Sequence, residues 1–461
     1  MQKSGKRFLV ADYNEEGATM TLAETIYDYA AKVASSPIDG KTSEEIKKRI
    51  VDSIFVSYGA RNAEPLKIAM KSLLPSRGKL NAPIYFTKRK AAIDVSSFIN
   101  GSMTRYLDYN DTYLSKEALH PSDNIPPILA YAYANESSGE SILKSIAVAY
   151  QVVGALSDAV SIRDRGWDHV TYISISVAAG LATLNGYDRD RFVHTLNLAI
   201  NNNISLRQTR AGELSMWKGC TAANASRNSV FASMLAGNGF SGPSPIFEGE
   251  MGFFRQVSGE FTLDFSRNLI LKTMIKNFPV EYHAMSAVES ALNLRKQIGE
   301  EQIKEINVDT FSVAHKIIVK DPEKLRPKTK ETADHSMPYI IAYTFLHGEP
   351  DLSSFRDQYL KDSNIHRLID IMNVKVKQEY DKMYPEYLPV KITVITSGGR
   401  YESEVLFPKG HFKNPYSWED LLNKGERILG SREKANEILE AGRKIEKITV
   451  REFFEVINQT S

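Results

Sequence analysis

The sequence predicts a mainly α-helical protein, with a large all-helical domain and a smaller α+β domain. With 461 residues the chain exceeds what one typical hydrophobic core uses, so two domains are expected. Up to about residue 265 the apolar residues recur at helical spacing, and beyond it short alternating segments typical of strands appear. The predicted boundaries are 1–265 for the helical domain and 266–415 for the α+β domain, with further helices in 416–461.

The composition, 42% hydrophobic and 25% charged, is that of an ordinary globular protein. Lys plus Arg number 58 against 56 for Asp plus Glu, so the net charge of +2 creates no basic field for nucleic acid or a membrane surface. The single cysteine, Cys220, excludes an internal disulfide and a cysteine-ligated zinc or iron–sulfur cluster. Without a signal peptide or a long apolar run, a soluble cytoplasmic protein is expected.

The first part of the chain shows helices separated by short loops. Residues 1–19 are expected to form an irregular arm, after which Thr21 can cap a helix that ends by Pro37. The segment 141–160 is apolar on nearly all sides, which predicts the central helix of a bundle. A short strand is predicted at 82–87, and the other helices of this region at 42–56, 63–74, 91–111, 125–135, 173–186, 191–200 and 219–236.

The α+β domain is predicted from its alternating segments. Residues 304–319 and 371–378 alternate like strands, and 390–407 reads as a hairpin with Ser397, Gly398 and Gly399 at its turn. Helices are predicted at 286–296, 333–346, 421–429, 433–441 and 451–457. By their pattern the last three helices could pack on either domain, and we expect the helices of 416–461 to join the helical domain.

Polar groups concentrate in the stretch 100–129. If its first part is helical, Asp108 and Thr112 are four residues apart and share one face, and His120 follows in a polar loop. The run 122–124 can cap a helix that begins at Ile125, and a helix start favours anions. Each residue alone has a structural explanation as a cap, a pair or a loop residue. Together they indicate an acid/base site for an anionic substrate.

Other candidates lie near predicted helix starts. Lys218 opposes the dipole of the helix that follows it, so we expect a role other than capping. The remaining candidates are cations and histidines for which solvated or structural roles are the alternative: Arg163, His169, Arg207, Arg210, Lys276, His283, Lys328 and His335. No HExxH motif, acid cluster or glycine-rich nucleotide motif occurs, so no metal or cofactor is predicted. The chemistry expected is cofactor-free proton transfer on an anion.

Several segments together resemble the MmgE/PrpD family: NGSMTRYLDYNDTY with HPS, GWDHVTY, WKGCTAANASRN, GFSGPSPIFEGEMGFF, FPVEYHAMSAVESAL and ETADHSMPYIIAY, between about residues 91 and 345. The resemblance implies a helical domain built from both chain ends, an α+β lid domain and a homodimer. It also implies a catalytic set on the matching positions, namely Asp108, Thr112, His120, His169, Lys218 and His283. Asn110 stands where many members carry another acid.

Within the family, the segments after residue 278 resemble the 2-methylcitrate dehydratase branch. Such an enzyme removes water from a 2-hydroxy tricarboxylate, 2-methylcitrate or citrate, and forms a cis-alkene. The resemblance implies that Asp108 and His120 transfer protons, that Lys218 and His169 stabilise carboxylate charge, and that Thr112 orients the substrate. Candidates for holding the carboxylates are Arg105, Arg163, Arg207, Arg210 and Lys276.

Other activities on the same scaffold stay open at this point. A cis-aconitate decarboxylase would need only the acid step, and an iminodisuccinate-type epimerase would need two opposed bases. A helical protein that only binds a partner would carry an apolar replacement in the pocket, and none is seen. A cluster-dependent aconitase is excluded by the cysteine count. Which group is the base and which the acid is not assigned by the sequence.

Overall fold

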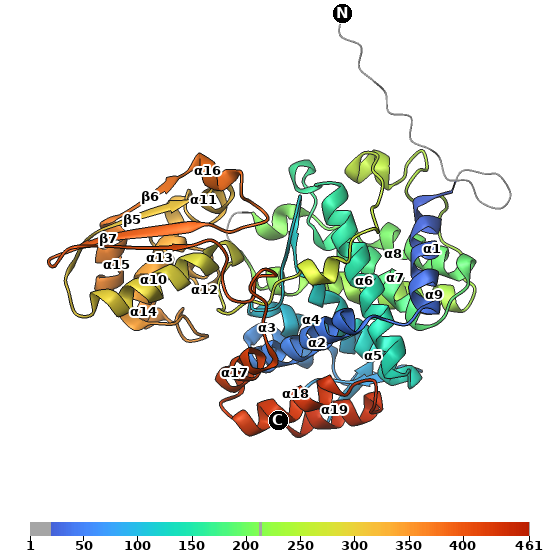
Figure 1. Ribbon diagram of the computed structural model, residues 1–461. Coiled ribbons are helices and arrows are strands. Elements are labelled where there is room, and N and C mark those ends of the chain that lie inside the picture. The colour runs from blue at the N-terminus through green and yellow to red at the C-terminus, as the bar shows by residue number, and fades with distance from the viewer. Residues whose placement is uncertain (1–19, 212–213, 461) are drawn as a thin grey trace, which may run out of the picture.

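The computed structural model describes residues 20–211 and 214–460, so the predicted arm at 1–19 lies outside the described residues. A large helical body lies beside a smaller α+β body (Figure 1). Most described residues are helical and the strands are few, which confirms the predicted fold class.

The helical body begins with helices that follow the predicted order. Thr21 caps the first of them, as predicted, in a reciprocal arrangement with Glu24. Two short antiparallel pairs, β1 (Asn81–Pro83) with β2 (Lys90–Ala92) and β3 (Tyr113–Leu114) with β4 (Ala118–Leu119), interrupt the helices. The helices are α1 (Leu22–Ser35), α2 (Gly40–Ala60), α3 (Glu64–Leu73), α4 (Ile93–Tyr106), α5 (Ile125–Asn135), α6 (Gly139–Ala159), α7 (Val170–Leu184), α8 (Arg189–Asn202) and α9 (Thr221–Gly237).

The centre of this body is formed by α6 and α7, which pack against each other. Gly180 of α7 allows a close approach, since an added Cβ would lie 3.1 Å from the Cβ of Ala149. In the described part of the chain, α6 is the one helix long and apolar enough to cross a membrane, but 78% of its most apolar window is buried inside the protein. Its apolar surface therefore has the burial of a core helix.

The α+β body contains a four-stranded sheet with the strand order β6-β5-β7-β8. Its strands are β5 (Ile303–Thr310), β6 (Met372–Val376), β7 (Val390–Thr396) and β8 (Arg400–Val405). The pair β5–β6 is parallel and the other two pairs are antiparallel. Helix α10 (Met285–Ile298) packs on the sheet, and α13 (Met337–His347) packs on α10. Shorter helices complete this body: α11 (Ser312–Ile318), α12 (Lys330–Ala333), α14 (Asp357–Leu360), α15 (Ser363–Asp370) and α16 (Gln378–Asp381).

One strand prediction in this body is wrong over half its length. The segment 304–319 was expected to be extended, but β5 ends at Thr310 and α11 follows. The carboxylate of Asp381 accepts hydrogen bonds from the backbone N–H and the hydroxyl of Ser312, both at 2.6 Å. This long-range capping contact favours a helix start that the local alternation does not reveal.

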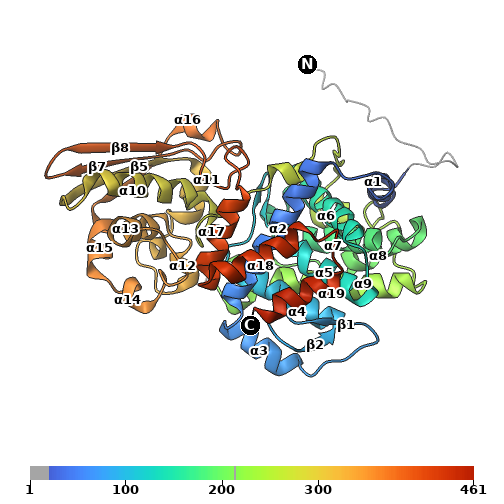
Figure 2. The ribbon, with the colours of Figure 1, turned by 60° about the horizontal axis from the view of Figure 1, so that its bottom comes forward.

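The last three helices pack on the helical body, which answers the question that the sequence left open. Helices α17 (Trp418–Leu429) and α18 (Arg432–Arg443) contact α2, and α19 (Val450–Gln459) contacts α5. Figure 2 shows α17 at the junction between the two bodies. The predicted boundaries at 265 and 415 stay predictions. One core of buried residues joins residues from Leu22 to Ile275 with those from Tyr416 to Ile457, and a second holds residues from Met274 to Val394 together with Leu114.

A buried ion pair anchors α17 to the helical body. Lys424 Nζ lies 2.6 Å from Asp52 Oδ1 of α2, and the two side chains are 0% and 1% exposed. The same ammonium donates a hydrogen bond to the backbone carbonyl of Tyr109, at 3.0 Å. Burial lowers the pKa of Lys424 to about 8, against the opposing effect of Asp52. This lysine therefore connects the C-terminal helices to the segment after α4.

We expect Lys424→Met to lower the free energy of unfolding by about 3–5 kcal/mol, because it leaves the buried carboxylate of Asp52 without a counter-ion. Urea denaturation followed by circular dichroism measures this. The exposed Lys444→Met should change stability by about 0.5 kcal/mol or less. Most of the loss should return in the double variant Asp52→Leu/Lys424→Met. A single variant as stable as the wild type would contradict the ion-pair explanation.

Candidate active site

The end of α4 gives Asp108 its position. The helix stops at Tyr106, and Asp108 has a φ of +53°, a left-handed conformation that is uncommon outside glycine. The Asp108 N–H donates to the carbonyl of Arg105, and the Arg105 Nη1 lies 2.7 Å from Asp108 Oδ1. The predicted helix to residue 111 is therefore wrong at its end. A backbone in this conformation is strained and must be held by its surroundings.

Lys276 supplies part of this support. Its Nζ donates to the backbone carbonyl of Asp108 at 2.6 Å, to Asp108 Oδ1 at 3.1 Å and to the carbonyl of Val280 at 3.2 Å. The side chain is 1% exposed. An ammonium has three N–H donors, and these contacts use all of them. Lys276 was predicted to bind substrate, but its contacts are those of a residue that positions Asp108.

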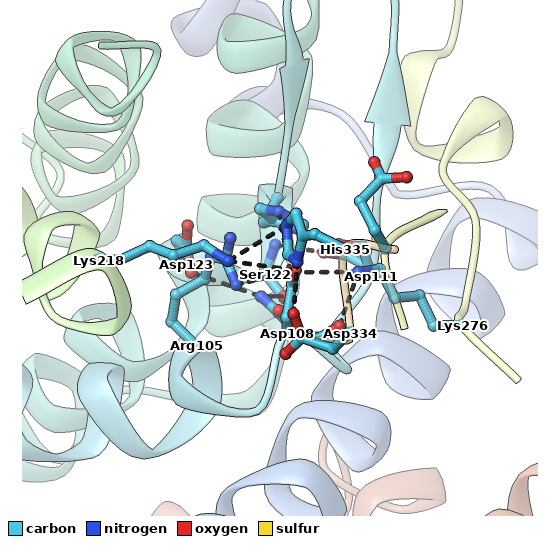
Figure 3. Close-up of polar contacts among 12 residues, drawn as sticks. Arg105, Asp108, Asp111, Ser122, Asp123, Lys218, Lys276, Asp334 and His335 are labelled. Carbon is cyan, nitrogen blue, oxygen red and sulfur yellow. Dashed lines mark hydrogen bonds and ion pairs between the residues drawn. The ribbon is translucent and has the colours of Figure 1, made fainter. Parts of the chain in front are cut away.

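Three further groups complete the surroundings of the Asp108 carboxylate. His120 Nε2 lies 3.6 Å from Oδ1, while His335 Nε2 and Lys218 Nζ lie 3.4 and 3.9 Å from Oδ2. Figure 3 shows Lys218 reaching this point from one side and Lys276 from the other. We call Arg105, Asp108, His120, Lys218, Lys276 and His335 the Asp108 cluster. The structure thus brings together residues from both bodies of the protein.

The cluster fixes the charges of its members. Burial opposes ionisation of Asp108, but the cations Arg105, Lys276 and Lys218 hold the pKa of its carboxyl well below the usual value. Burial lowers the pKa of Lys218 to about 8, with Asp108 opposing that shift. A firmly ionised carboxylate is a weak base, so its main effect is to orient and balance the surrounding groups.

His120 is oriented by the loop that follows Asp108. Its Nδ1 lies 2.7 Å from the backbone carbonyl of Asp111, which assigns the proton to Nδ1 and leaves Nε2 facing Asp108 as an acceptor. The carboxylate of Asp111 is itself held by the N–H of Ser122 and the hydroxyl of Tyr150, each at 2.8 Å. Burial, with the charge of Arg105, holds the pKa of His120 well below its usual value. The ring is therefore neutral and able to accept a proton.

The local structure around His120 differs in part from the prediction. Helix α5 begins at Ile125 as predicted, but it is preceded by the 3-10 turn η1 (Pro121–Asn124), and no side chain of this turn caps it. The Asn124 side chain donates instead to the carbonyl of Pro121 and accepts from Ser176 of α7. The Asn124 side chain, which local rules assign to capping, therefore forms other hydrogen bonds in the folded protein.

His169 lies beside His120, at 6.3 Å between ring centroids. Its Nδ1 is 3.2 Å from Asp168 Oδ1, and Asp168 Oδ2 is 2.9 Å from Nε of Arg210. Burial, with Arg210, lowers the pKa of His169 to about 3, against the effect of Asp168. Arg210 was predicted to hold a substrate carboxylate, but its Nε is already paired with Asp168.

Thr112 does not share a helix face with Asp108, contrary to the prediction. Its backbone forms an antiparallel bridge with Met274, with both N–H to carbonyl distances at 2.8 Å. Its hydroxyl is buried and has no hydrogen-bond partner within the residues that the structure describes. Thr112 therefore still offers a polar atom, but from a strand-like segment.

Besides Thr112, His169 and Arg210, three more predicted residues lie outside the Asp108 cluster. His283 contacts Glu281 at 2.8 Å and the hydroxyl of Tyr384 at 3.3 Å. Arg163 donates to the carbonyl of Lys116 at 2.6 Å and is partly exposed. The half-buried Arg207 has no side-chain hydrogen bond or ion pair to any described residue. The placement of these three gives no direct support to the roles predicted for them.

His335 and Asp334 belong to the site, although the sequence pattern predicts no catalytic role for either. They lie between α12 and α13, and His335 Nδ1 is 2.5 Å from Asp334 Oδ1. The signal in the sequence is the run Ala-Asp-His-Ser before the proline-containing helix start, which makes His335 a candidate without a role. Its contact with Lys218 spans 117 positions of sequence, which no local pattern predicts.

Unsatisfied polar atoms surround the cluster. Buried side-chain atoms without a hydrogen-bond partner in the described part of the chain include Arg105 Nε, Asn110 Oδ1, Thr112 Oγ1, Asp123 Oδ2, His169 Nε2 and Arg210 Nη2. Burial also raises the pKa of Asp123 to about 7, with Arg105 opposing. Buried polar atoms are rarely left unpaired, so a polar ligand is the natural partner of this group. No set of three or more His, Cys, Asp or Glu arranged for a metal ion occurs among the described residues.

The fold and the cluster define an enzyme whose buried acid/base site lies at the junction of a helical and an α+β body. Residues 24–266 match the model of the MmgE/PrpD N-terminal domain, and residues 278–447 match that of the MmgE/PrpD C-terminal domain. The chain belongs to the MmgE/PrpD family and is an enzyme of the hydro-lyase class.

Named relatives are similar over about two thirds of the chain. A 2-methylcitrate dehydratase of Escherichia coli is 27% identical over 350 residues, covering 68% of this chain and 71% of that protein. A mitochondrial 2-methylcitrate dehydratase of Yarrowia lipolytica is 28% identical over 348 residues, with coverages of 68% and 66%. An alkylcitrate dehydratase of a fungal species is 27% identical over 371 residues, 72% of each chain. These relatives point to a dehydratase of the citrate type.

Proposed function

We propose that the protein dehydrates 2-methylcitrate, or a closely related 2-hydroxy tricarboxylate such as citrate, to the cis-alkene without a cofactor. The observation that carries this proposal is the set of unsatisfied buried polar atoms on the residues of the Asp108 cluster and its neighbours. Most of these atoms are donors or neutral acceptors, which a hydroxylated polycarboxylate can satisfy. The dehydratase names of the relatives support the same substrate class.

The reaction needs a base for a C–H proton next to a carboxylate and an acid for the departing hydroxyl. We assign the base to His120, whose Nε2 is unprotonated and faces the cluster. The carbonyl of Asp111 keeps this imidazole oriented, and Asp108 balances the nearby cations. In this proposal Lys218 and His169 stabilise the enolate-like charge on the substrate carboxylate. Thr112 offers its free hydroxyl to orient the substrate.

The carboxylates that do not react need cations of their own. Arg105 keeps its Nε free although its Nη1 contacts Asp108, and Arg210 keeps its Nη2 free. Planar guanidinium groups bind carboxylates through paired donors, so these two atoms suit that role. Arg163, Arg207 and His283 stay candidates on the resemblance alone. Because the cluster is buried, substrate entry requires the α+β body to move as a lid.

The test is an absorbance assay near the ultraviolet edge that follows formation of the conjugated alkene. Purified protein is mixed with 2-methylcitrate, citrate or cis-aconitate, with and without a chelator. We expect a rising signal with 2-methylcitrate that the chelator does not reduce. Carbon dioxide release from cis-aconitate without dehydration would assign the decarboxylase activity instead. No reaction with any of the three would overturn the proposal and leave the epimerase and the non-catalytic binding protein to be tested.

The location, oligomeric state and partners of the enzyme are also proposals. We propose a cytoplasmic homodimer with a small tricarboxylate as its only ligand and no nucleic-acid or membrane partner. The near-zero net charge of +2 supports the absence of a nucleic-acid or membrane partner. Light scattering after size exclusion gives the oligomeric state directly.

A further inference from the structure

His335 reaches the Asp108 cluster from the α+β body, whereas His120 belongs to the helical body. The two Nε2 atoms approach different oxygens of one carboxylate, His120 at 3.6 Å from Oδ1 and His335 at 3.4 Å from Oδ2 of Asp108. The two imidazoles are therefore placed around one fixed anion by two different parts of the fold.

A chain of contacts fixes the orientation of His335. Its Nδ1 faces Asp334 Oδ1 at 2.5 Å, and Asp334 Oδ2 accepts from Lys330 at 3.0 Å. The backbone carbonyl of Asp334 accepts in addition from the N–H of Glu281, at 2.8 Å. A carboxylate that holds Nδ1–H directs Nε2 into the site and stabilises the imidazolium form.

The charges that face the two histidines differ. His335 has two carboxylates beside it, Asp334 and Asp108, and one cation, Lys218, whose Nζ lies 3.2 Å from its Nε2. His120 has the backbone carbonyl of Asp111 on Nδ1, and the cations near it outnumber the single carboxylate of Asp108. Burial and the charge of Lys218 lower the pKa of His335, against the opposing effects of Asp334 and Asp108. The geometry still gives a proton on His335 two carboxylate neighbours, whereas a proton on His120 Nε2 would have one.

We propose that His335 is the general acid of the dehydration and His120 its base, so that each body of the protein contributes one half of the proton transfer. This inference rests on the proposed function. His120 Nε2 takes the proton from the carbon next to a carboxylate, and the C–H electron pair forms the C=C bond. The C–O bond breaks, and the hydroxyl leaves as water with the proton from His335 Nε2. Exchange with solvent after product release restores both rings.

This assignment makes the lid a chemical part of the site. His335 belongs to the α+β body, and among the described residues its Nδ1 is held by Asp334 of the same body. The acid is therefore in place only when the segment between α12 and α13 lies against Asp108 and Lys218. Asp334 acts as a positioning residue through His335. Water elimination is then limited to the closed arrangement of the two bodies.

The experiment compares His335→Gln with His120→Gln on two substrates. One is the hydroxy tricarboxylate that the wild type dehydrates, and the other is its analogue with fluorine in place of the hydroxyl. Fluoride leaves without a full proton, so it does not need the general acid. Alkene absorbance and a fluoride electrode follow the reactions, and His347→Gln, at the far end of α13, is the matched control.

We expect His335→Gln to lose about 10²-fold or more in turnover of the hydroxy substrate and only a few-fold with the fluoro analogue. His120→Gln should lose activity with both substrates. Asp334→Asn should show the same pattern as His335→Gln, with a smaller loss of turnover. Equal losses of His335→Gln on both substrates, or none on either, would overturn the acid assignment. A wild-type protein that is inactive on the hydroxy tricarboxylate would overturn the proposed dehydratase function, and the acid assignment would fall with it.

Discussion

His120→Gln is expected to lower kcat for the hydroxy tricarboxylate by about 10²–10⁴-fold, the usual contribution of a positioned base. Glutamine keeps similar volume and can still contact the carbonyl of Asp111, but it cannot accept the proton. Because the ring is held neutral by burial and by Arg105, the wild-type activity should not need deprotonation of His120 at neutral pH. Steady-state kinetics with the alkene assay measures the loss.

The control for this variant is His315→Gln, a half-buried histidine on α11 in the other body of the protein. Its turnover should stay within a factor of about two of the wild type, and both variants should unfold at the same urea concentration. Unchanged turnover in His120→Gln would remove this histidine from the mechanism.

Asp108→Asn should reduce both stability and turnover. The amide keeps the shape of the side chain but leaves the buried cations Arg105, Lys276 and Lys218 without their counter-ion, which costs about 3–5 kcal/mol. Loss of this anion also releases Arg105 and Lys218 from their positions in the site, so turnover should fall as well. Urea denaturation at neutral pH, with kinetics on the folded protein, measures both effects.

The stability difference should depend on pH in a defined direction. The folded-state pKa of Asp108 lies well below its unfolded value of about 3.9, so its contribution is fully present above that value. It is lost as the pH falls through the folded-state pKa, and the wild type and Asp108→Asn should then converge. The exposed Asp357→Asn, whose carboxylate is 82% exposed, should show no such dependence. Equal stability of Asp108→Asn and wild type at neutral pH would contradict the charge-balance explanation.

The amino-acid sequence by itself determined the local elements and the residue types of the site. The apolar run behind Pro126 and Pro127 specifies α5 at its observed bounds, because prolines in a first turn cost no hydrogen bond. Asp108, His120 and Lys218 are predicted from their types and surroundings, and the structure places His120 and Lys218 within 4 Å of the Asp108 carboxylate. Residue type decides which chemistry is available, and this information is local.

Only the tertiary structure decided how these residues act. The left-handed Asp108 depends on Lys276, 168 positions away, and on Lys424, which holds the next carbonyl from the C-terminal helices. His335 joins the site across 117 positions, from a different body of the protein. Such contacts arise when separate elements pack and bury their charges together. Periodicity and capping rules describe neighbouring residues only, so they do not predict these contacts. The physical reason is that burial fixes protonation and orientation, and burial belongs to the folded assembly of elements.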